Sequence, residues 1–419
     1  MTARIHVIGA GLAGLAAALR LAPHGREIFI HEAAPQAGGR CRSYFDATLG
    51  MVIDNGNHLL LSGNHAAQAF LREIGAEDRL VGPETADFAF IDFANGARWR
   101  LRPNDGPIPW WVLSSQRRVP DTRIRDYFAP LALLKAAKGT PIGAAMVCKG
   151  TLYERLWRPF FLAALNTEPG EAEASLAATL LRETLMKGGR ACRPLVAQPG
   201  LSAAFIEPAL AWLAAQNVQI TFKRRLSNIV FAEGHVARLD FGHESIAIDA
   251  ADQVVLAVPP VVAVSLVPDL PAPRSFRAIV NAHFKIAPPA GLAPITGIVN
   301  GLAEWLFVFP DRLSVTISGA DRLLDTPREV LAERIWQDVA RVTQIAQPLP
   351  TWQIIREIRA TFAATPEEEA RRPATRTAFP NLFLAGDWTA TGLPATIEGS
   401  IRSGFRAAAE ILCLSRNSI

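Results

Sequence analysis

The sequence predicts an α/β protein in which a Rossmann-like dinucleotide-binding domain is interleaved with an α+β domain for the substrate. Three observations predict this fold class. A strand, a glycine-rich turn and a helix open the chain, a second strand–loop–helix unit closes it, and the long segment between them is rich in apolar residues. With 419 residues, of which 50% are hydrophobic, the chain can bury a large core.

The amino-terminal unit has the spacing of a dinucleotide-binding motif. A buried strand is predicted at 4–8, and an Ala- and Leu-rich helix follows the turn and ends near residue 21. In such a turn the first glycine permits the tight bend, the second lets the backbone approach a pyrophosphate, and the third lets helix and strand pack closely. The helix N-terminus presents free N–H groups and a positive dipole to the phosphates. The predicted cofactor-binding residues here are Gly9, Gly11, Leu12, Ala13 and Gly14.

A second predicted strand at 27–31 ends on Glu32, about twenty residues after the turn. An acid at this position accepts hydrogen bonds from a ribose. The two strands, the helix and the acid together predict dinucleotide binding, and the alternative is a glycine-rich turn without a ligand. The sequence contains no second G-x-G-x-x-G, so we expect no nicotinamide domain. The electrons would then come from the substrate or from a transient donor, which stays unknown.

The residues after Glu32 suggest which dinucleotide is bound. The run Ala-Ala-Pro-Gln-Ala-Gly-Gly-Arg at 33–40 resembles the extended FAD fingerprint of the amine oxidase and phytoene desaturase superfamily, whose cofactor domain is of the glutathione reductase type. The resemblance implies FAD, with Ala33, Gly39 and Arg40 at its site. In that superfamily the arginine lies near the FAD phosphates, where a charge-assisted contact with phosphate is favourable.

The carboxyl-terminal unit resembles a second part of the same superfamily. A buried strand predicted at 381–385 leads directly into Gly386 and Asp387. The resemblance implies that these two residues lie near the ribityl chain and the pyrophosphate. The preceding segment 366–376 is expected to be a surface connection.

A long helix is predicted from Pro394 or Thr396 to Cys413. The resemblance implies that Thr396 and Ile397 begin a helix aimed at the pyrimidine edge of the flavin. A helix N-terminus there would favour negative charge on the reduced flavin. An ordinary docking helix is the alternative, although it would not account for the Gly-Asp pair before it.

The middle of the chain also contributes to the cofactor domain by this resemblance. After a short strand at 51–53, the stretch with Asn55, Gly56 and Asn57 is expected to return toward the isoalloxazine. Leu226 stands where the superfamily has an aliphatic residue whose backbone meets the adenine.

Three more strands are predicted at 218–222, 235–241 and 253–258, and they would rejoin the cofactor domain. The predicted bounds of the two domains follow from these assignments. The FAD-binding domain takes residues 1–60, 195–261 and 350–419, and the substrate-binding domain takes residues 61–194 and 262–349.

Composition argues against several function classes. The net charge is only +4 and the basic residues are scattered, so no nucleic-acid partner is expected. The four cysteines are far apart, and the eight histidines lack metal-ligand spacing, so we expect neither a metal nor disulfides. No apolar run reaches the roughly 20 residues that span a bilayer. A cytoplasmic protein is therefore expected.

Two stretches of the predicted substrate domain fit a bilayer interface. Trp110 and Trp111 precede a pair of arginines, and the stretch 131–138 combines apolar residues with Lys135 and Lys138. Each stretch alone is better explained by a helix pair with a tryptophan packed inward. Together with an apolar substrate, they would indicate peripheral contact with the inner face of the cytoplasmic membrane.

A closer resemblance rests on the stretches 54–61, 156–167 and 382–399. Together they resemble the hydroxysqualene dehydroxylase family, the squalene-associated FAD-dependent desaturases of bacterial hopanoid synthesis, over essentially the whole chain. One departure is Asn57, where we expect glutamine in the family. The resemblance implies a long-chain isoprenoid substrate, hydroxysqualene. Its allylic hydroxyl would leave as water while FADH2 gives a hydride, and squalene would form.

Such a reaction needs a reduced flavin, an acid or hydrogen-bond donor at the leaving oxygen, and a long dry pocket. By sequence, Asp54 and His58 are the polar side chains nearest to the expected flavin face. His58 is the preferred donor, and a structural hydrogen bond to backbone or flavin is its alternative role. Asn166 is a second, weaker candidate for holding the hydroxyl.

Three other functions stay open. A carotenoid or phytoene-type desaturase or isomerase would bind a similar long polyene on the same frame. An amine oxidase is less favoured, because it usually needs a tyrosine at the start of the last helix, where Thr396 stands. A flavin-binding protein without redox chemistry, such as a membrane scaffold for a neighbouring synthase, is the third alternative.

Overall fold

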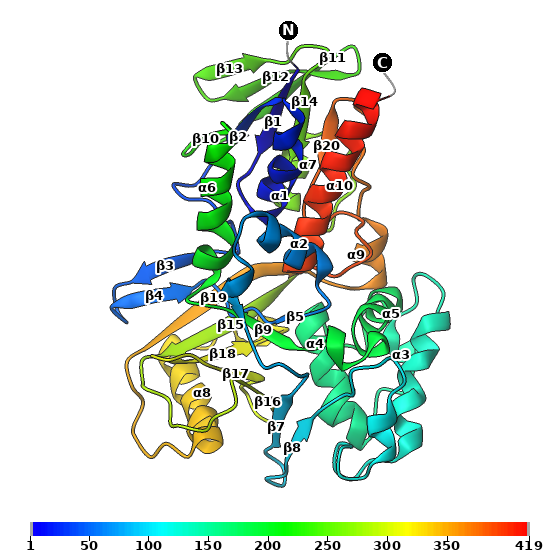
Figure 1. Ribbon diagram of the computed structural model, residues 1–419, viewed down its shortest axis with the longest axis vertical. Coiled ribbons are helices and arrows are strands. Elements are labelled where there is room, and N and C mark those ends of the chain that lie inside the picture. The colour runs from blue at the N-terminus through cyan, green and yellow to red at the C-terminus, as the bar shows by residue number, and fades with distance from the viewer. Residues whose placement is uncertain (1–2, 417–419) are drawn as a thin grey trace.

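Two regions are stacked along the long axis of the molecule, and the chain passes between them several times (Figure 1). The computed structural model describes residues 3–416. A parallel sheet with its helices forms the upper region, and a mixed sheet with a group of short helices forms the lower one. Both kinds of region were predicted. Within residues 3–416 no helix has the length and apolar character needed to cross a bilayer.

The upper region is built on a five-stranded parallel sheet. In spatial order its strands are β10 (Gln219–Thr221), β2 (Glu27–His31), β1 (Arg4–Ile8), β14 (Gln253–Leu256) and β20 (Leu382–Leu384). Helix α1 (Leu12–Leu21) packs against α10 (Ile397–Arg416) and α6 (Glu207–Ala215) beside the sheet. The strands β1 and β2 have the bounds that the sequence predicts. Their apolar side chains are buried, as in a parallel sheet covered on both faces.

A small antiparallel sheet extends from the top of this region. It consists of β11 (Asn228–Ala232), β12 (His235–Phe241) and β13 (Glu244–Ala247). Of the three strands predicted in this part of the chain, the middle one is confirmed as β12, and the other two are present as β10 and β14 with shorter bounds. The hairpin partners of β12 were not predicted.

The lower region is built on a seven-stranded sheet. In spatial order its strands are β19 (Trp352–Phe362), β15 (Phe276–Phe284), β18 (Leu313–Ile317), β17 (Trp305–Val308), β16 (Ile295–Val299), β7 (Phe88–Asp92) and β8 (Arg98–Leu101). Helix α8 (Arg328–Thr343) packs its apolar side chains on this sheet. The predicted boundary at 349/350 divides the sheet, because β19 lies beyond it. The domain bounds therefore stay a proposal.

Short helices form the lower right of Figure 1. They are η3 (Trp110–Leu113), η4 (Ile124–Lys135), α3 (Ile142–Ala145), η5 (Tyr153–Trp157), α4 (Arg158–Leu165) and α5 (Ala174–Glu183). The other elements are η1 (Ala22–His24), β3 (Ser43–Asp46), β4 (Met51–Asp54), β5 (Leu60–Leu61), α2 (His65–Glu73), η2 (Glu77–Arg79), β6 (Leu80–Val81), η6 (Leu185–Lys187), η7 (Gly189–Ala191), β9 (Pro194–Ala197), η8 (Ser202–Ile206), α7 (Pro260–Leu266), η9 (Ala320–Leu323) and α9 (Pro366–Ala370).

The segment 366–376 is not the plain surface connection that the sequence suggested. It begins with α9, and the side chain of Arg372 just after this helix is 0% exposed. Three glutamates precede Arg372 in α9, and such a charge-rich run normally indicates a solvated face. Here Glu369 instead forms an ion pair with Arg372 at 2.6 Å. This pairing compensates the charge of the buried Arg372 side chain.

Two histidines are buried side by side in the parallel sheet. His6 on β1 and His31 on β2 place Nδ1 and Nε2 of their rings 3.2 Å apart. Burial lowers the pKa of His6 to about 4 and that of His31 to about 3, with the proximity of His6 as a second cause for His31. Both rings are therefore neutral in the folded protein near pH 7.

We predict that acid destabilises the fold through this pair. The unfolded chain binds a proton at each histidine below about pH 6.5, and the folded chain does so only near pH 3 to 4. The free energy of unfolding should fall by roughly 1 kcal/mol per ring between pH 7 and pH 5.5. Urea unfolding at both pH values measures this. The H6N/H31N variant should lose clearly less stability than the wild type, and an equal loss would show that other groups are responsible.

Candidate functional site

The glycine-rich turn lies between β1 and α1, at the carboxyl edge of the parallel sheet. Gly9 has a φ of +108°, and its N–H donates to the His31 carbonyl at 2.8 Å. A Cβ on Gly14 would lie 1.9 Å from the Gly9 oxygen, so only glycine fits there. A Cβ on Gly11 would meet no atom within 4 Å, so the chain itself does not demand glycine at this position. The open space beside Gly11 fits a pyrophosphate approaching the backbone.

A second glycine loop lies beside the first. Gly11 forms an isolated parallel bridge with Gly38, and a Cβ on Gly39 would lie 3.7 Å from the Gly11 Cα. Gly11 is the N-cap of α1 and has no side chain to cap it, so the first N–H groups of the helix, at Leu12 and Ala13, lack a side-chain partner. A helix end of this kind favours a bound anion.

Glu32 is placed as predicted, at the end of β2 beside the glycine-rich turn. Its carboxylate accepts from the N–H groups of Ala10 and Ala34, both at 2.7 Å, next to the exposed Ala33. The backbone N–H of Arg224 donates to the Glu32 carbonyl at 2.8 Å, which brings the loop with the buried Leu226 to this edge. Each carboxylate oxygen has further lone pairs, so Glu32 can still accept from a ribose.

An ion pair joins the two ends of the chain at the site. The Arg40 guanidinium donates to both carboxylate oxygens of Asp387 at 2.7 Å and also to the carbonyl of Ala360 at the end of β19. The Asp387 charge is the main cause that raises the pKa of Arg40. The sequence assigned both charged residues to the cofactor, and the structure shows that they also contact one another. The Arg40 side chain stays 42% exposed, so it remains accessible to a phosphate.

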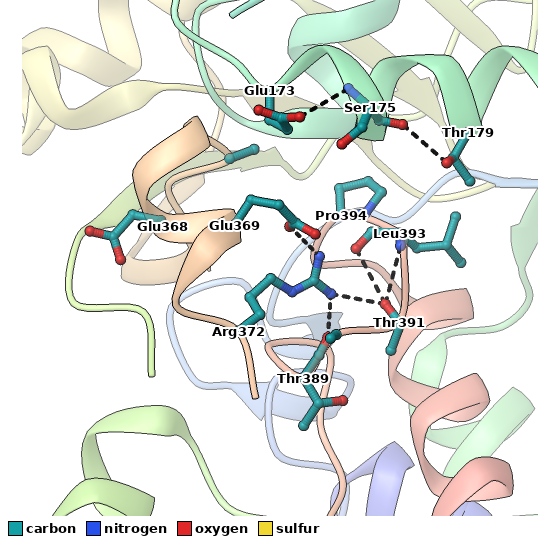
Figure 2. A network of polar contacts seen from close by, with 12 residues as sticks. Glu173, Ser175, Thr179, Glu368, Glu369, Arg372, Thr389, Thr391, Leu393 and Pro394 are labelled. Atoms are coloured by element: carbon teal, nitrogen blue, oxygen red, sulfur yellow. Dashed lines mark hydrogen bonds and ion pairs between the residues drawn. The ribbon is translucent and has the colours of Figure 1, made fainter. Parts of the chain in front are cut away.

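The loop that carries Asp387 is fixed from behind by Arg372 (Figure 2). The Arg372 guanidinium donates to the Asp387 carbonyl at 3.1 Å, to the Thr389 carbonyl, and to the Thr391 hydroxyl at 2.9 Å. Its face also lies over the Phe362 ring. Sequence analysis missed Arg372, because nothing local distinguishes a buried arginine from an exposed one.

The last helix begins one residue after Thr396, the later of the two starting positions predicted for it. The Thr396 hydroxyl accepts from the Gly399 N–H at 3.0 Å, so Thr396 caps α10 and Ile397 is its first residue. The Gly386 N–H donates to the Ser403 hydroxyl of α10 at 2.8 Å, which ties the loop to the helix. The prediction of a helix start at this point is confirmed.

Asp54 ends β4 and is committed to protein partners. Its Oδ1 accepts from the Ser43 hydroxyl at 2.6 Å and from the Leu201 N–H at 2.8 Å. Burial raises the pKa of this carboxyl. These bonds tie β3 and β4 to the start of η8. They hold Asp54 in place before the following loop, and its catalytic role stays a prediction.

The following loop lies against the seven-stranded sheet. The Asn57 N–H donates to the Asn281 side chain of β15 at 3.4 Å, and a Cβ on Gly56 would lie 3.1 Å from the same side chain. Asn55 donates to the Glu357 carboxylate of β19 at 3.2 Å. Glu357 also contributes to raising the pKa of Arg40, so its carboxylate belongs to the site. The sequence did not single out Glu357, because Arg356 and Arg359 beside it in β19 make it resemble one more charge of a mixed strand.

His58 follows this loop and differs from the other two predicted catalytic residues. It is half-buried, and no hydrogen bond to its ring is formed within the described part of the chain. Burial lowers the pKa of His58 to about 4, with the Arg40 charge as a second cause. The ring is therefore neutral at pH 7, free to donate one hydrogen bond and a poor source of a proton.

Asn166 is held by hydrogen bonds to three other segments of the chain. Its amide donates to Thr361 at 3.0 Å and to the Arg277 carbonyl at 3.3 Å, and it accepts from the Gly319 N–H at 2.7 Å. The residue ends α4 with a left-handed φ of +49° and is 2% exposed. These bonds join α4 to β15 and β19. They engage both ends of the amide, and a role in holding the substrate hydroxyl stays a prediction.

The family model described as flavin-containing amine oxidoreductase matches residues 12–412. The chain is 55% identical over 417 residues to a hydroxysqualene dehydroxylase of Rhodopseudomonas palustris, an alignment that covers 99% of this chain and 100% of that protein. It is 24% identical to a probable zeta-carotene desaturase of Synechococcus elongatus, with 98% of each chain covered.

Among solved structures, a cyclohexylamine oxidase of Brevibacterium oxydans has a TM-score of 0.70 at 17% identity, covering 99% of this chain and all of that one. This likeness shows the fold of the flavin-binding amine oxidases. The family match and the identity to the curated relatives establish the predicted FAD cofactor and the predicted oxidoreductase class. The chain belongs to the flavin-containing amine oxidoreductase family, in the group whose curated members are named hydroxysqualene dehydroxylase.

Proposed function

We propose that this chain removes the hydroxyl of hydroxysqualene and releases squalene. The observation that carries the proposal is the 55% identity to a hydroxysqualene dehydroxylase, because it extends over the region outside the cofactor motifs as well. Reduced FAD supplies the hydride for this chemistry. The allylic C–O bond breaks, the carbon takes the hydride, and the hydroxyl takes a proton and leaves as water.

The residues of this chain divide the work of holding FAD. The glycine-rich turn and the N-terminus of α1 hold the pyrophosphate, and Glu32 and the Leu226 loop hold the adenosine end. Arg40 and Asp387 lie between these groups and the flavin end, where Thr396 and Ile397 begin α10. The free helix end, the open space at Gly11 and the accessible guanidinium support this assignment.

His58 is the residue that we propose for the substrate oxygen. Its ring is neutral and unpartnered, whereas Asp54 and Asn166 are bound to other protein groups. A neutral imidazole donates its N–H to the oxygen and stabilises the negative charge that develops as the C–O bond breaks. The proton that completes the water then comes from another donor.

Three alternatives are weaker on specific grounds. Identity to the zeta-carotene desaturase is 24%, less than half of that to the dehydroxylase. For an amine oxidase, the three tyrosines stand on β3, η4 and η5, and Thr396 occupies the start of α10. A flavin-binding scaffold without redox chemistry is disfavoured by the 55% identity to a protein named as a dehydroxylase. Contact with a membrane, and a place on its inner face, are part of our proposal, and they would suit an apolar substrate.

We predict that the holoprotein, reduced without oxygen, converts hydroxysqualene dispersed in detergent to squalene. Flavin absorbance should return to the oxidised spectrum, with one squalene extracted per flavin. The proposal fails if the flavin stays reduced while a polyene bleaches the oxidised enzyme, because that result identifies a desaturase. Protein carrying the Gly14→Ala change is not a suitable control here, because that change disturbs the fold.

Two glycine variants should separate cofactor binding from folding. In Gly11→Ala the new methyl group meets no protein atom, so the protein freed of FAD should unfold at the wild-type temperature while its affinity for FAD falls at least tenfold. In Gly14→Ala the methyl group meets the Gly9 oxygen, so the fold itself should lose stability. Calorimetry and flavin titration measure the two effects. If G11A binds FAD normally, the pyrophosphate does not lie at this turn.

The change His58→Ala should lower kcat about a hundredfold, the usual cost of removing one donor to developing charge. Flavin content should stay unchanged. Because His58 titrates near pH 4, the wild-type kcat should show no inflection from this residue between pH 6 and pH 8. A pH profile of single turnovers tests this. An inflection near pH 6.5 that disappears in H58N would show that the charged imidazolium takes part.

A further inference from the structure

An unusually apolar surface lies on the short helices of the lower region, at the right of Figure 1. Seven large hydrophobic side chains are exposed within a stretch of the chain that spans fewer than fifty residues. They are Ile108, Trp110, Leu113, Ile124, Phe128, Leu131 and Val147. Trp110 and Val147 are the most open, with exposed fractions of 61% and 63%. We call the surface formed by residues 105–149 the docking face.

The exposed side chains cannot be hidden by turning these helices inward. The other sides of the same elements are already packed, with Trp111 of η3, Leu133 of η4 and Ile142 of α3 all buried in the largest core cluster. Helix η4 also contacts η3, α3 and α5. The tryptophan expected to pack inward is therefore Trp111, whereas Trp110 is exposed. The docking face keeps its apolar side chains in water, which is costly for an isolated protein.

The docking face also carries an excess of basic residues. Residues 105–149 contain seven Lys or Arg and three Asp or Glu, so their net charge of +4 equals that of the whole protein. Six of the seven basic residues are exposed. The exposed lysines are Lys135, Lys138 and Lys149. Aromatic and aliphatic side chains surrounded by lysine and arginine are the composition of an interfacial membrane contact.

We propose that the docking face binds an anionic lipid bilayer, with the seven apolar side chains in its interfacial layer. Charge selects this partner over a second copy of the chain, because a symmetric dimer would bring two surfaces of charge +4 together. Anionic headgroups would attract the same residues. The inference rests on the proposed function in one respect, since an apolar triterpene substrate is itself dissolved in membranes.

The docking face is one helix away from the flavin-binding loop. Helix α5 contacts η4 on one side. Figure 2 shows Glu173, Ser175 and Thr179, at and after the start of α5, above the loop with Leu393 and Pro394. A hollow of about 390 Å³ lined by residues 143–149 opens within the docking face. A lipid-dissolved substrate bound at the docking face would therefore be separated from the flavin-binding loop by α5.

The test is sedimentation of the full-length holoprotein with vesicles. Wild-type protein should sediment with phosphatidylcholine vesicles that contain about one third phosphatidylglycerol, bind pure phosphatidylcholine far less, and be released by salt. The variant Trp110→Ser, Phe128→Ser should bind at least tenfold more weakly. Each charge removed in Lys135→Gln, Lys138→Gln, Lys149→Gln should weaken binding roughly fivefold.

A matched control removes exposed apolar side chains elsewhere. Phe45 and Val52 lie opposite one another on β3 and β4 and are 66% and 56% exposed, so the variant Phe45→Ser, Val52→Ser should bind vesicles like wild type. The proposal is overturned if this control loses as much binding as W110S/F128S. It is also overturned if wild type stays in the supernatant, or if light scattering shows a dimer that W110S/F128S dissolves.

The assay separates this inference from the proposed function. The W110S/F128S variant should convert detergent-dispersed hydroxysqualene at the wild-type rate and lose turnover only when the substrate is embedded in vesicles. If the wild type turns over substrate in detergent but does not bind vesicles, the membrane-binding inference is refuted and the dehydroxylase function stands. If the wild type binds vesicles but turns over no substrate in either medium, the dehydroxylase function is refuted and the membrane-binding inference stands.

Discussion

The ion pair between Arg40 and Asp387 is the contact on which the assembly of the site depends. It joins residues almost at opposite ends of the sequence. Arg40 also donates to the Ala360 carbonyl and so contacts the carboxyl end of strand β19. The amino-terminal glycine loops, the carboxyl-terminal loop and the edge of the lower sheet therefore meet at one guanidinium. An arginine suits this task, because its planar guanidinium donates in two directions, through Nη2 to Asp387 and through Nη1 to the Ala360 carbonyl.

The buried Arg372 gives this contact its rigidity. It has no route to solvent, so its charge must be matched by Glu369 and by the oxygens of the loop that it holds. The cost of leaving any of these groups unpaired keeps the loop in one conformation. Asp387 thus meets Arg40 in a fixed position, and α10 starts from the same loop.

The sequence predicted the elements that obey local rules. The strands β1 and β2, the helix α1 and the start of α10 follow from apolar runs, glycine spacing and a threonine cap. The contacts that depend on folding could not be read in this way. Arg372 and Glu357 resemble ordinary surface charges in the sequence, and Asp54 and Asn166 resemble catalytic groups until their hydrogen bonds are known. A polar residue shows its type locally, but its partners belong to distant segments.

The uneven placement of charge has a consequence for how copies of the protein behave together. Outside residues 105–149 the acidic and basic residues are equal in number, so the net charge of this stretch equals that of the whole molecule. If that face is turned toward anionic lipid, its excess positive charge is neutralised by the headgroups. The rest of each molecule has no net charge. Neighbouring copies on a bilayer would then tolerate dense lateral crowding, whereas the same copies in dilute buffer are kept apart.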